Sequence, residues 1–135
     1  EPMTSTATDA LSVVRGVYGA FARGDMLGFF ALMAPDIRWH EADGHPYGGV
    51  YVGVDAIVKN VLTPLGTEWE NFTAETDDFI AQGDTVVSIG TYRGTYRRTG
   101  RKVEAAYAVV WKVKNGKVQS LDQHTDTAKF QNAIR

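Results

Sequence analysis

Apolar residues at the start of the chain repeat with the period of an amphipathic helix. Across residues 6–23 they recur at i, i+3, i+7 and i+10, which predicts a helix with one buried stripe. The stripe consists of Leu11, Val14, Tyr18 and Phe21. Thr6 followed by Asp9 resembles a capping box at the start of this helix, and Gly24 predicts its end.

Two further helices and one strand are expected before residue 69. A short helix between Gly24 and Pro35 and a longer one between Asp55 and Pro64 each contain several apolar residues, and each ends where a proline follows. Between these helices, residues 36–41 alternate as the residues of a strand do. One side of this strand carries Ile37, Trp39 and Glu41.

The rest of the chain predicts strands. They cover residues 69–81, 85–97, 101–114 and 117–127. The intervening QGD, RTG and NG segments are hairpin turn signals. Three helices followed by an antiparallel meander predict an α+β domain over residues 1–135, in which a curved antiparallel sheet wraps around the helices. Residues 1–5 are expected to be disordered or to be the remnant of a tag.

The pairing of the last two strands decides which face of the sheet lies inside. A two-residue turn at Asn115-Gly116 pairs Val109 with Asp122. We assign the aromatic face to the interior. That face carries Val86, Ser88, Gly90, Tyr92, Tyr107, Val109 and Trp111, together with Asp122, His124 and Asp126. A slip of one residue would reverse the last strand. It would bring inward Leu121, Gln123 and Thr125.

Composition narrows the classes of function. A chain of 135 residues is large enough for one domain with a sizeable core. Its net charge of -2 gives no basic field for a nucleic acid, and no apolar run is long enough to span a membrane, so neither partner is expected. The absence of cysteine excludes disulfides and thiolate metal sites. It also agrees with a reducing compartment, and we expect a cytoplasmic location.

Four stretches of the sequence carry a family resemblance: VYGAFARGD, APDIRWHEADG, GVDAIV and VVWKVKNGKVQSLDQHTDTA. Across about residues 11–128 the chain resembles the nuclear transport factor 2-like superfamily, and within it the SnoaL-like polyketide cyclase and ketosteroid isomerase group. The resemblance implies a cystatin-like, cone-shaped domain with a pocket that uses no cofactor. It also implies that the protein forms a homodimer.

Only one of the three functional positions of the isomerases keeps its chemical type of side chain in this sequence. The isomerase base falls on Glu41, which is still a carboxylate. The oxyanion-binding tyrosine falls on Val17, beside Tyr18, and the protonated aspartate falls on Ala108 or Val109. Both oxyanion donors are therefore missing, which argues against the known steroid isomerisation.

The cyclase positions are also replaced. The aspartate and histidine of the polyketide cyclases fall on Gln123 and Val109. His124 and Asp126 lie close to these positions and are candidates to rebuild an acid/base pair.

Glu41 is the first candidate for a catalytic base. A carboxylate enclosed by Trp39 and other aromatic side chains would lose its hydration, which raises its pKa toward neutral and suits removal of a proton next to a carbonyl. The alternative is a solvated carboxylate at a strand end, because glutamate is rarely buried unless it is paired.

His124 and Asp126 are the second candidates for catalysis. They lie two residues apart on one strand, so the carboxylate can orient the imidazole within the same cavity. The alternative is a pair that only satisfies its own polar groups near the cavity mouth. Asp122 is expected either to line the site or to pair with a nearby arginine.

Aromatic and apolar residues, together with one aspartate, are expected to form the wall of a substrate site. The candidates are Tyr18, Trp39, Tyr47, Tyr92, Tyr107, Val109, Trp111 and Asp122. Tyr18 or Tyr107 could replace the missing oxyanion donors, although core packing explains each of them as well. His40 and His45 have no partners at metal-ligand spacing, so neither a metal nor another cofactor is expected.

Two functions remain open. The first is a cofactor-independent acid/base enzyme, an isomerase, cyclase, hydratase or dehydratase, which acts on a small hydrophobic carbonyl or polyketide-like substrate. The second is a non-catalytic module that binds a small ligand or serves as a dimeric interaction domain. In either case a homodimer is expected through the outer sheet face, where aliphatic side chains need cover. These are Val87, Ile89, Val110 and Leu121.

Overall fold

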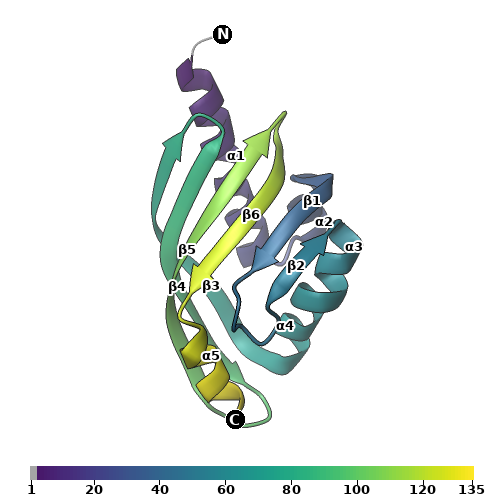
Figure 1. Cartoon of the computed structure of the whole chain (residues 1–135), viewed down its shortest axis with the longest axis vertical. Coiled ribbons are helices and arrows are strands. Elements are labelled where there is room, and N and C mark those ends of the chain that lie inside the picture. The colour runs from purple at the N-terminus through teal and green to yellow at the C-terminus, as the bar shows by residue number, and fades with distance from the viewer. Residues whose placement is uncertain (1–2) are drawn as a thin grey trace.

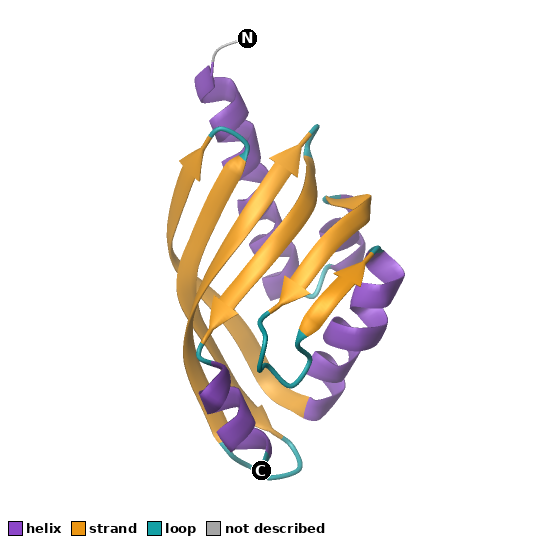
Figure 2. Ribbon diagram, viewed as in Figure 1, coloured by secondary structure: helices purple, strands orange, loops and turns teal. Residues whose placement is uncertain are grey.

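Six strands form one open, mixed sheet in the order β2-β1-β6-β5-β4-β3, and helices pack against it (Figures 1 and 2). The computed structural model describes residues 3–135, with side chains from residue 9 onward. In chain order the elements are α1 (Met3–Arg23), α2 (Met26–Ala31), β1 (Met33–Glu41), β2 (Gly49–Val52), α3 (Val54–Ile57), the π-helix η1 (Val58–Leu62), α4 (Thr63–Glu68), β3 (Trp69–Gln82), β4 (Thr85–Tyr96), β5 (Lys102–Lys114), β6 (Lys117–Thr125) and α5 (Thr127–Ile134). The predicted α+β class is confirmed.

Helix α1 lies against the long strands β3 to β6 (Figure 1). Its apolar stripe is confirmed, because Val14, Val17 and Ala20 are buried while Tyr18 and Phe21 are half-buried beside them. The helix begins at Met3, so the predicted cap falls inside it. Glu1 and Pro2, which we expected to be disordered or derived from a tag together with residues 3–5, lie outside the described residues.

Strand β1 is longer than predicted. The second helix ends at Ala31, and the strand already begins at Met33 and runs through Pro35. Pro35 is tolerated because the pairing of β1 with β6 is interrupted between Met33 and Arg38, so no ladder hydrogen bond is needed there. The predicted alternation that follows is confirmed, since the side chains on one side are buried. These are Ile37, Trp39 and Glu41.

The third helical segment does not end at Pro64. It continues as α3, η1 and α4, with Pro64 in the first turn of α4, directly after the π-helical turn. Strand β2, which is not among the predicted strands, pairs antiparallel with β1. Helix α5 was not predicted either. Figure 1 shows it next to the chain end, across one end of the long strands.

The predicted inward face of β4 and β5 is confirmed, but the predicted orientation of β6 is wrong. The hairpin pairs Val113 with Val118 as expected, and Lys112 then pairs with Ser120, so Gln119 is an extra residue in a β-bulge. One extra residue reverses every side chain that follows. Val109 consequently pairs with Gln123.

The bulge determines which β6 side chains face the core. Leu121 and Gln123 are buried, whereas His124 is exposed. Asp122 lies on the outer face, 3.5 Å from Arg38 and 3.2 Å from His40. Asp126 is exposed at the first turn of α5. The expectation that the two aspartates and His124 point inward is therefore incorrect, and the one-residue slip describes the strand.

Candidate functional site

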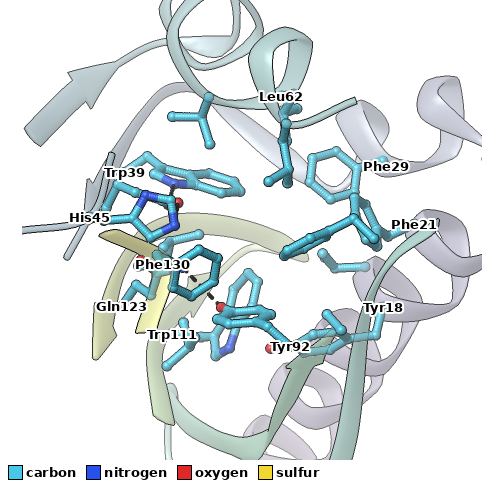
Figure 3. Close-up of a pocket in the computed structure, with 18 residues that line it drawn as sticks. Tyr18, Phe21, Phe29, Trp39, His45, Leu62, Tyr92, Trp111, Gln123 and Phe130 are labelled. Carbon is cyan, nitrogen blue, oxygen red and sulfur yellow. Dashed lines mark hydrogen bonds and ion pairs between the residues drawn. The ribbon is translucent and has the colours of Figure 1, made fainter. Parts of the chain in front are cut away.

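A cavity of about 80 Å³ lies between the helices and the inner face of the sheet (Figure 3). Its wall is almost entirely apolar and aromatic, with a few polar groups that come from α1, β1, the loop after β1, β4 and β6. The lining residues are Val17, Tyr18, Phe21, Phe29, Trp39, Glu41, His45, Val61, Leu62, Leu65, Phe72, Ala74, Tyr92, Val109, Trp111, Leu121, Gln123 and Phe130. A largely apolar cavity with a few convergent polar groups is typical of a small-molecule site.

Glu41 is the acidic group of this cavity. The alternation of β1 turns it inward beside Trp39, and only 3% of the residue is exposed. The indole Nε1 of Trp39 donates a hydrogen bond of 2.8 Å to Oε1 of Glu41. Burial raises the pKa of the carboxyl from its ordinary value of 4.5 to about 7, against smaller lowering effects from Trp39 and Gln123. Glu41 is thus balanced between acid and base near neutral pH.

His45 lies beside Glu41 in the loop between β1 and β2. Its Nδ1 accepts a hydrogen bond of 3.0 Å from the backbone N–H of Tyr47, so the ring proton of the neutral form lies on Nε2. Nε2 is 3.6 Å from Oε2 of Glu41. Burial lowers the pKa of His45 to about 4. Protonating Nδ1 would also break the bond from Tyr47, so the ring is held neutral.

Gln123 and Tyr92 form the other polar pair at this end of the cavity. Oε1 of Gln123 accepts the backbone N–H of Ala42 at 3.0 Å, which directs Nε2 of the amide to the hydroxyl of Tyr92, also at 3.0 Å (Figure 3). The Tyr92 oxygen therefore accepts, and its own proton is available to a ligand. Burial, followed by the charge of Glu41, raises the pKa of Tyr92, so the phenol remains protonated.

A separate polar group lies where Tyr18 reaches the cavity. Its hydroxyl is 2.7 Å from Oγ of Ser88, which also accepts a 2.8 Å hydrogen bond from the indole of Trp111. The hydroxyl of Tyr107, in contrast, is hydrogen-bonded to the hydroxyl of Thr76 at 2.6 Å, and Tyr107 does not line the cavity. Its ring stacks on Tyr92 with centroids 4.2 Å apart.

The structure brings together part of the predicted site. Six of the predicted residues line the cavity: Glu41, Tyr18, Trp39, Tyr92, Val109 and Trp111. Tyr47 and Tyr107 do not line it; the hydroxyl of Tyr47 donates to Glu68 and accepts from Trp69. Asp122, His124 and Asp126 lie outside.

Of the cavity residues that were not among the predicted site residues, three belong to its polar end: Gln123, His45 and Phe130. Gln123 was considered only as an inward residue of the alternative pairing, in which the last strand slips by one residue. His45 follows Glu41 by four residues, but that spacing carries no meaning in a loop. Phe130 belongs to a helix that the strand pattern did not reveal. Its ring lies 4.4 Å from that of His45, centroid to centroid.

The described part of the chain lacks two features that would point to other functions. Within residues 3–135, no group of three or more His, Asp or Glu side chains is arranged to hold a metal ion. Over the same residues, no helix has the length and apolar character needed to cross a membrane.

Comparisons with known proteins place the chain among related folds. A family model described as a SnoaL-like domain matches residues 14–121. An NTF2-like protein from Burkholderia thailandensis E264 is 40% identical, with a TM-score of 0.90 over 93% of this chain and 97% of that one. TerC, co-crystallised with polyporic acid, is 26% identical, with a TM-score of 0.83 over 93% and 98%. An uncharacterised Mycobacterium tuberculosis H37Rv protein is 28% identical over 113 residues, 84% of this chain and 86% of its own length.

Proposed function

The chain belongs to the SnoaL-like domain family of the NTF2-like superfamily, and from this premise we propose that it is a cofactor-independent acid/base enzyme. The family includes cofactor-free isomerases and cyclases. The proposed substrate is a small, mainly apolar carbonyl compound. The reaction begins with removal of a proton from the carbon next to the carbonyl, as in an isomerase, cyclase, hydratase or dehydratase.

The observation that carries this proposal is the burial of Glu41. Among the described residues that line the cavity there is no lysine or arginine to neutralise the carboxylate. A buried acid without a cation is costly when ionised, so its pKa rises and it becomes a stronger base when it does ionise. A wall that only had to hold an apolar ligand would gain nothing from this cost.

The polar groups supply a complete proton-transfer step. Glu41 takes the proton from the α-carbon, and the electrons of that C–H bond move through the new C=C bond onto the carbonyl oxygen. The O–H of Tyr92, whose oxygen is already held by Gln123, donates a hydrogen bond to the developing oxyanion. Glu41, now protonated, returns the proton to another carbon or to the oxygen. No other reactant is needed for an isomerisation.

An exchange assay tests this function without knowledge of the natural substrate. Phenylacetone and 2-indanone in D₂O exchange their α-protons when a base removes them, and NMR follows the loss of signal. The wild-type protein should accelerate this exchange above buffer. In Glu41→Gln the rate of exchange above buffer should fall by roughly 100-fold or more.

Asp122→Asn is the matched control, because it makes the same carboxylate-to-amide change on the outer face. It should exchange at the wild-type rate. If the wild-type protein binds these ketones but exchanges them no faster than buffer does, the non-catalytic binding module is the correct reading.

The outer sheet face is proposed to bind a second copy of the chain. Val87, Ile89 and Val110 lie there, half-buried or exposed, whereas Leu121, which we also expected there, is buried in the core. Charged side chains border the aliphatic strip. Arg93, for example, pairs with Glu75 and Glu104. An aliphatic strip with a charged border is the usual composition of an interface between copies.

A further inference from the structure

Helix α5 closes one end of the cavity with a single aromatic ring. Phe130 is completely buried. The centroid of its ring lies 4.4 Å from that of His45, 5.6 Å from Trp69 and 6.0 Å from Tyr92. Figure 3 shows the ring close to His45 and Tyr92, at the end where Gln123 and Tyr92 meet. Phe130 is therefore the wall that faces the reactive groups.

The rest of α5 is held by apolar and polar contacts, with Ala133 buried in the core and Ile134 packed against it. Nε2 of Gln131 donates to the carbonyl of Gly44 at 2.8 Å, and Thr99 donates to the carbonyl of Ala133 at 2.6 Å. Gly44 is the residue before His45. Helix α5 thus contacts the His45 loop twice, once through the backbone of that loop and once through the ring of Phe130.

The cavity is small, and the ring of Phe130 is part of its wall. About 80 Å³ is well below the roughly 300–1,000 Å³ of typical small-molecule sites. The other aromatic walls at the polar end are fixed by hydrogen bonds, Trp39 to Glu41 and Tyr92 to Gln123. Phe130 has no polar atom to fix it, and it comes from a helix of eight residues.

We propose that Phe130 is the specificity-determining residue of the cavity, and that its ring limits the length of the aromatic or apolar ligands that can lie against Glu41 and His45. A smaller side chain at this position should admit ligands one ring longer. The inference rests on the proposed function only in placing the ligand in this cavity, because it concerns binding and not proton transfer.

Binding of two probes tests the proposal. The probes are p-cresol, with one ring, and 2-naphthol, with two fused rings, measured by calorimetry with the full chain. Phe130→Ala should raise the affinity for 2-naphthol relative to p-cresol by roughly tenfold or more, and Phe130→Leu should raise it by less. Ile134→Ala is the matched control, since Ile134 is a half-buried residue of the same helix that does not line the cavity. It should leave the ratio unchanged.

Three results would overturn the proposal. They are an unchanged affinity ratio in the Phe130 variants, an equal change in Ile134→Ala, and no binding of either probe by any variant. If Phe130→Ala does not fold, Phe130→Leu decides the question. Glu41→Gln in the Phe130→Leu background keeps the two proposals distinct, because the altered ratio should persist there even if the exchange assay detects no catalysis.

Discussion

Nε2 of His45 lies 3.6 Å from Oε2 of Glu41, and the side chains are only 2% and 4% exposed. Burial disfavours the charged form of each: it lowers the pKa of His45 to about 4 and raises that of Glu41 to about 7. The Tyr47 N–H that bonds Nδ1 reinforces the neutral imidazole. A neutral ring cannot neutralise the carboxylate, so Glu41 keeps the basicity that a salt bridge would remove.

The exchange rate should follow the ionisation of Glu41. Only the ionised carboxylate can remove a proton. We therefore expect the exchange rate, after the buffer rate is subtracted, to rise with pH through a midpoint of about 7 and then to level off. The measurement is α-proton exchange of 2-indanone between pH 5 and pH 9. A midpoint near 4.5, the value of a solvated glutamate, would assign the activity to an exposed carboxylate.

Replacing Glu41 should stabilise the fold at high pH. The carboxyl has a pKa of about 7 when folded and 4.5 ordinarily, so between these values the folded state binds more protons and stability falls as pH rises. Glu41→Gln removes this loss. Its free energy of unfolding should exceed the wild-type value by about 3 kcal/mol at pH 8 and by almost nothing at pH 4. Urea unfolding at both values measures this, and equal stabilities at pH 8 would rule out the buried charge.

The pKa of His45 should differ clearly from that of His40. Nitrogen-15 NMR should show a neutral ring with its proton on Nε2 and a midpoint of about 4. His40 is the internal control. Its hydrogen bond to Asp43 is the largest of the effects that raise its pKa, so it should titrate above its ordinary 6.5. The reverse order would contradict the geometry of the loop.

His45 has a consequence for acid stability. Its folded pKa is depressed, so the unfolded chain binds the extra proton, and stability is lost as pH falls from 6.5 toward 4. The contribution of Glu41 has the opposite sign between 4.5 and 6.5, so the two offset each other there.

The oligomeric state should depend on the outer sheet face. Ile89 is 38% exposed among aliphatic neighbours, so Ile89→Lys should convert a dimer into a monomer in light scattering. Leu27→Lys, at a more exposed leucine of α2, should leave the dimer intact. A monomeric wild-type protein at every concentration would reject this interface.

Local patterns were enough to predict most of the elements and the position of Glu41. The period of two in β1 placed Glu41 beside Trp39 on the inner side, and the turn signals fixed the four long strands closely. The register of β6 could not be predicted from local patterns, because the hairpin turn determines only the residue pairs next to it. The bulge at Gln119 is a single unpaired residue with no sequence signal of its own, yet it replaced Asp122 and His124 with Leu121 and Gln123 on the inner face.

The remaining differences arise from tertiary contacts. Strand β2 has four residues and exists because β1 offers it an edge. Helix α5 has only eight residues, and its one buried aromatic ring, Phe130, contacts partners on distant elements, β3, β4 and the His45 loop. Neither segment carries enough periodicity to be identified before the sheet is known.

The most direct measurement is the ionisation of the Glu41 carboxyl itself. Carbon-13 labelling of the glutamate side chains, with Glu41→Gln to assign the resonance, allows the carboxyl to be titrated by NMR. The cavity described above predicts a midpoint of about 7. A midpoint at or below about 5, the range of solvated glutamates, would mean that this carboxyl is hydrated, and it would remove the basis for an acid/base site at Glu41.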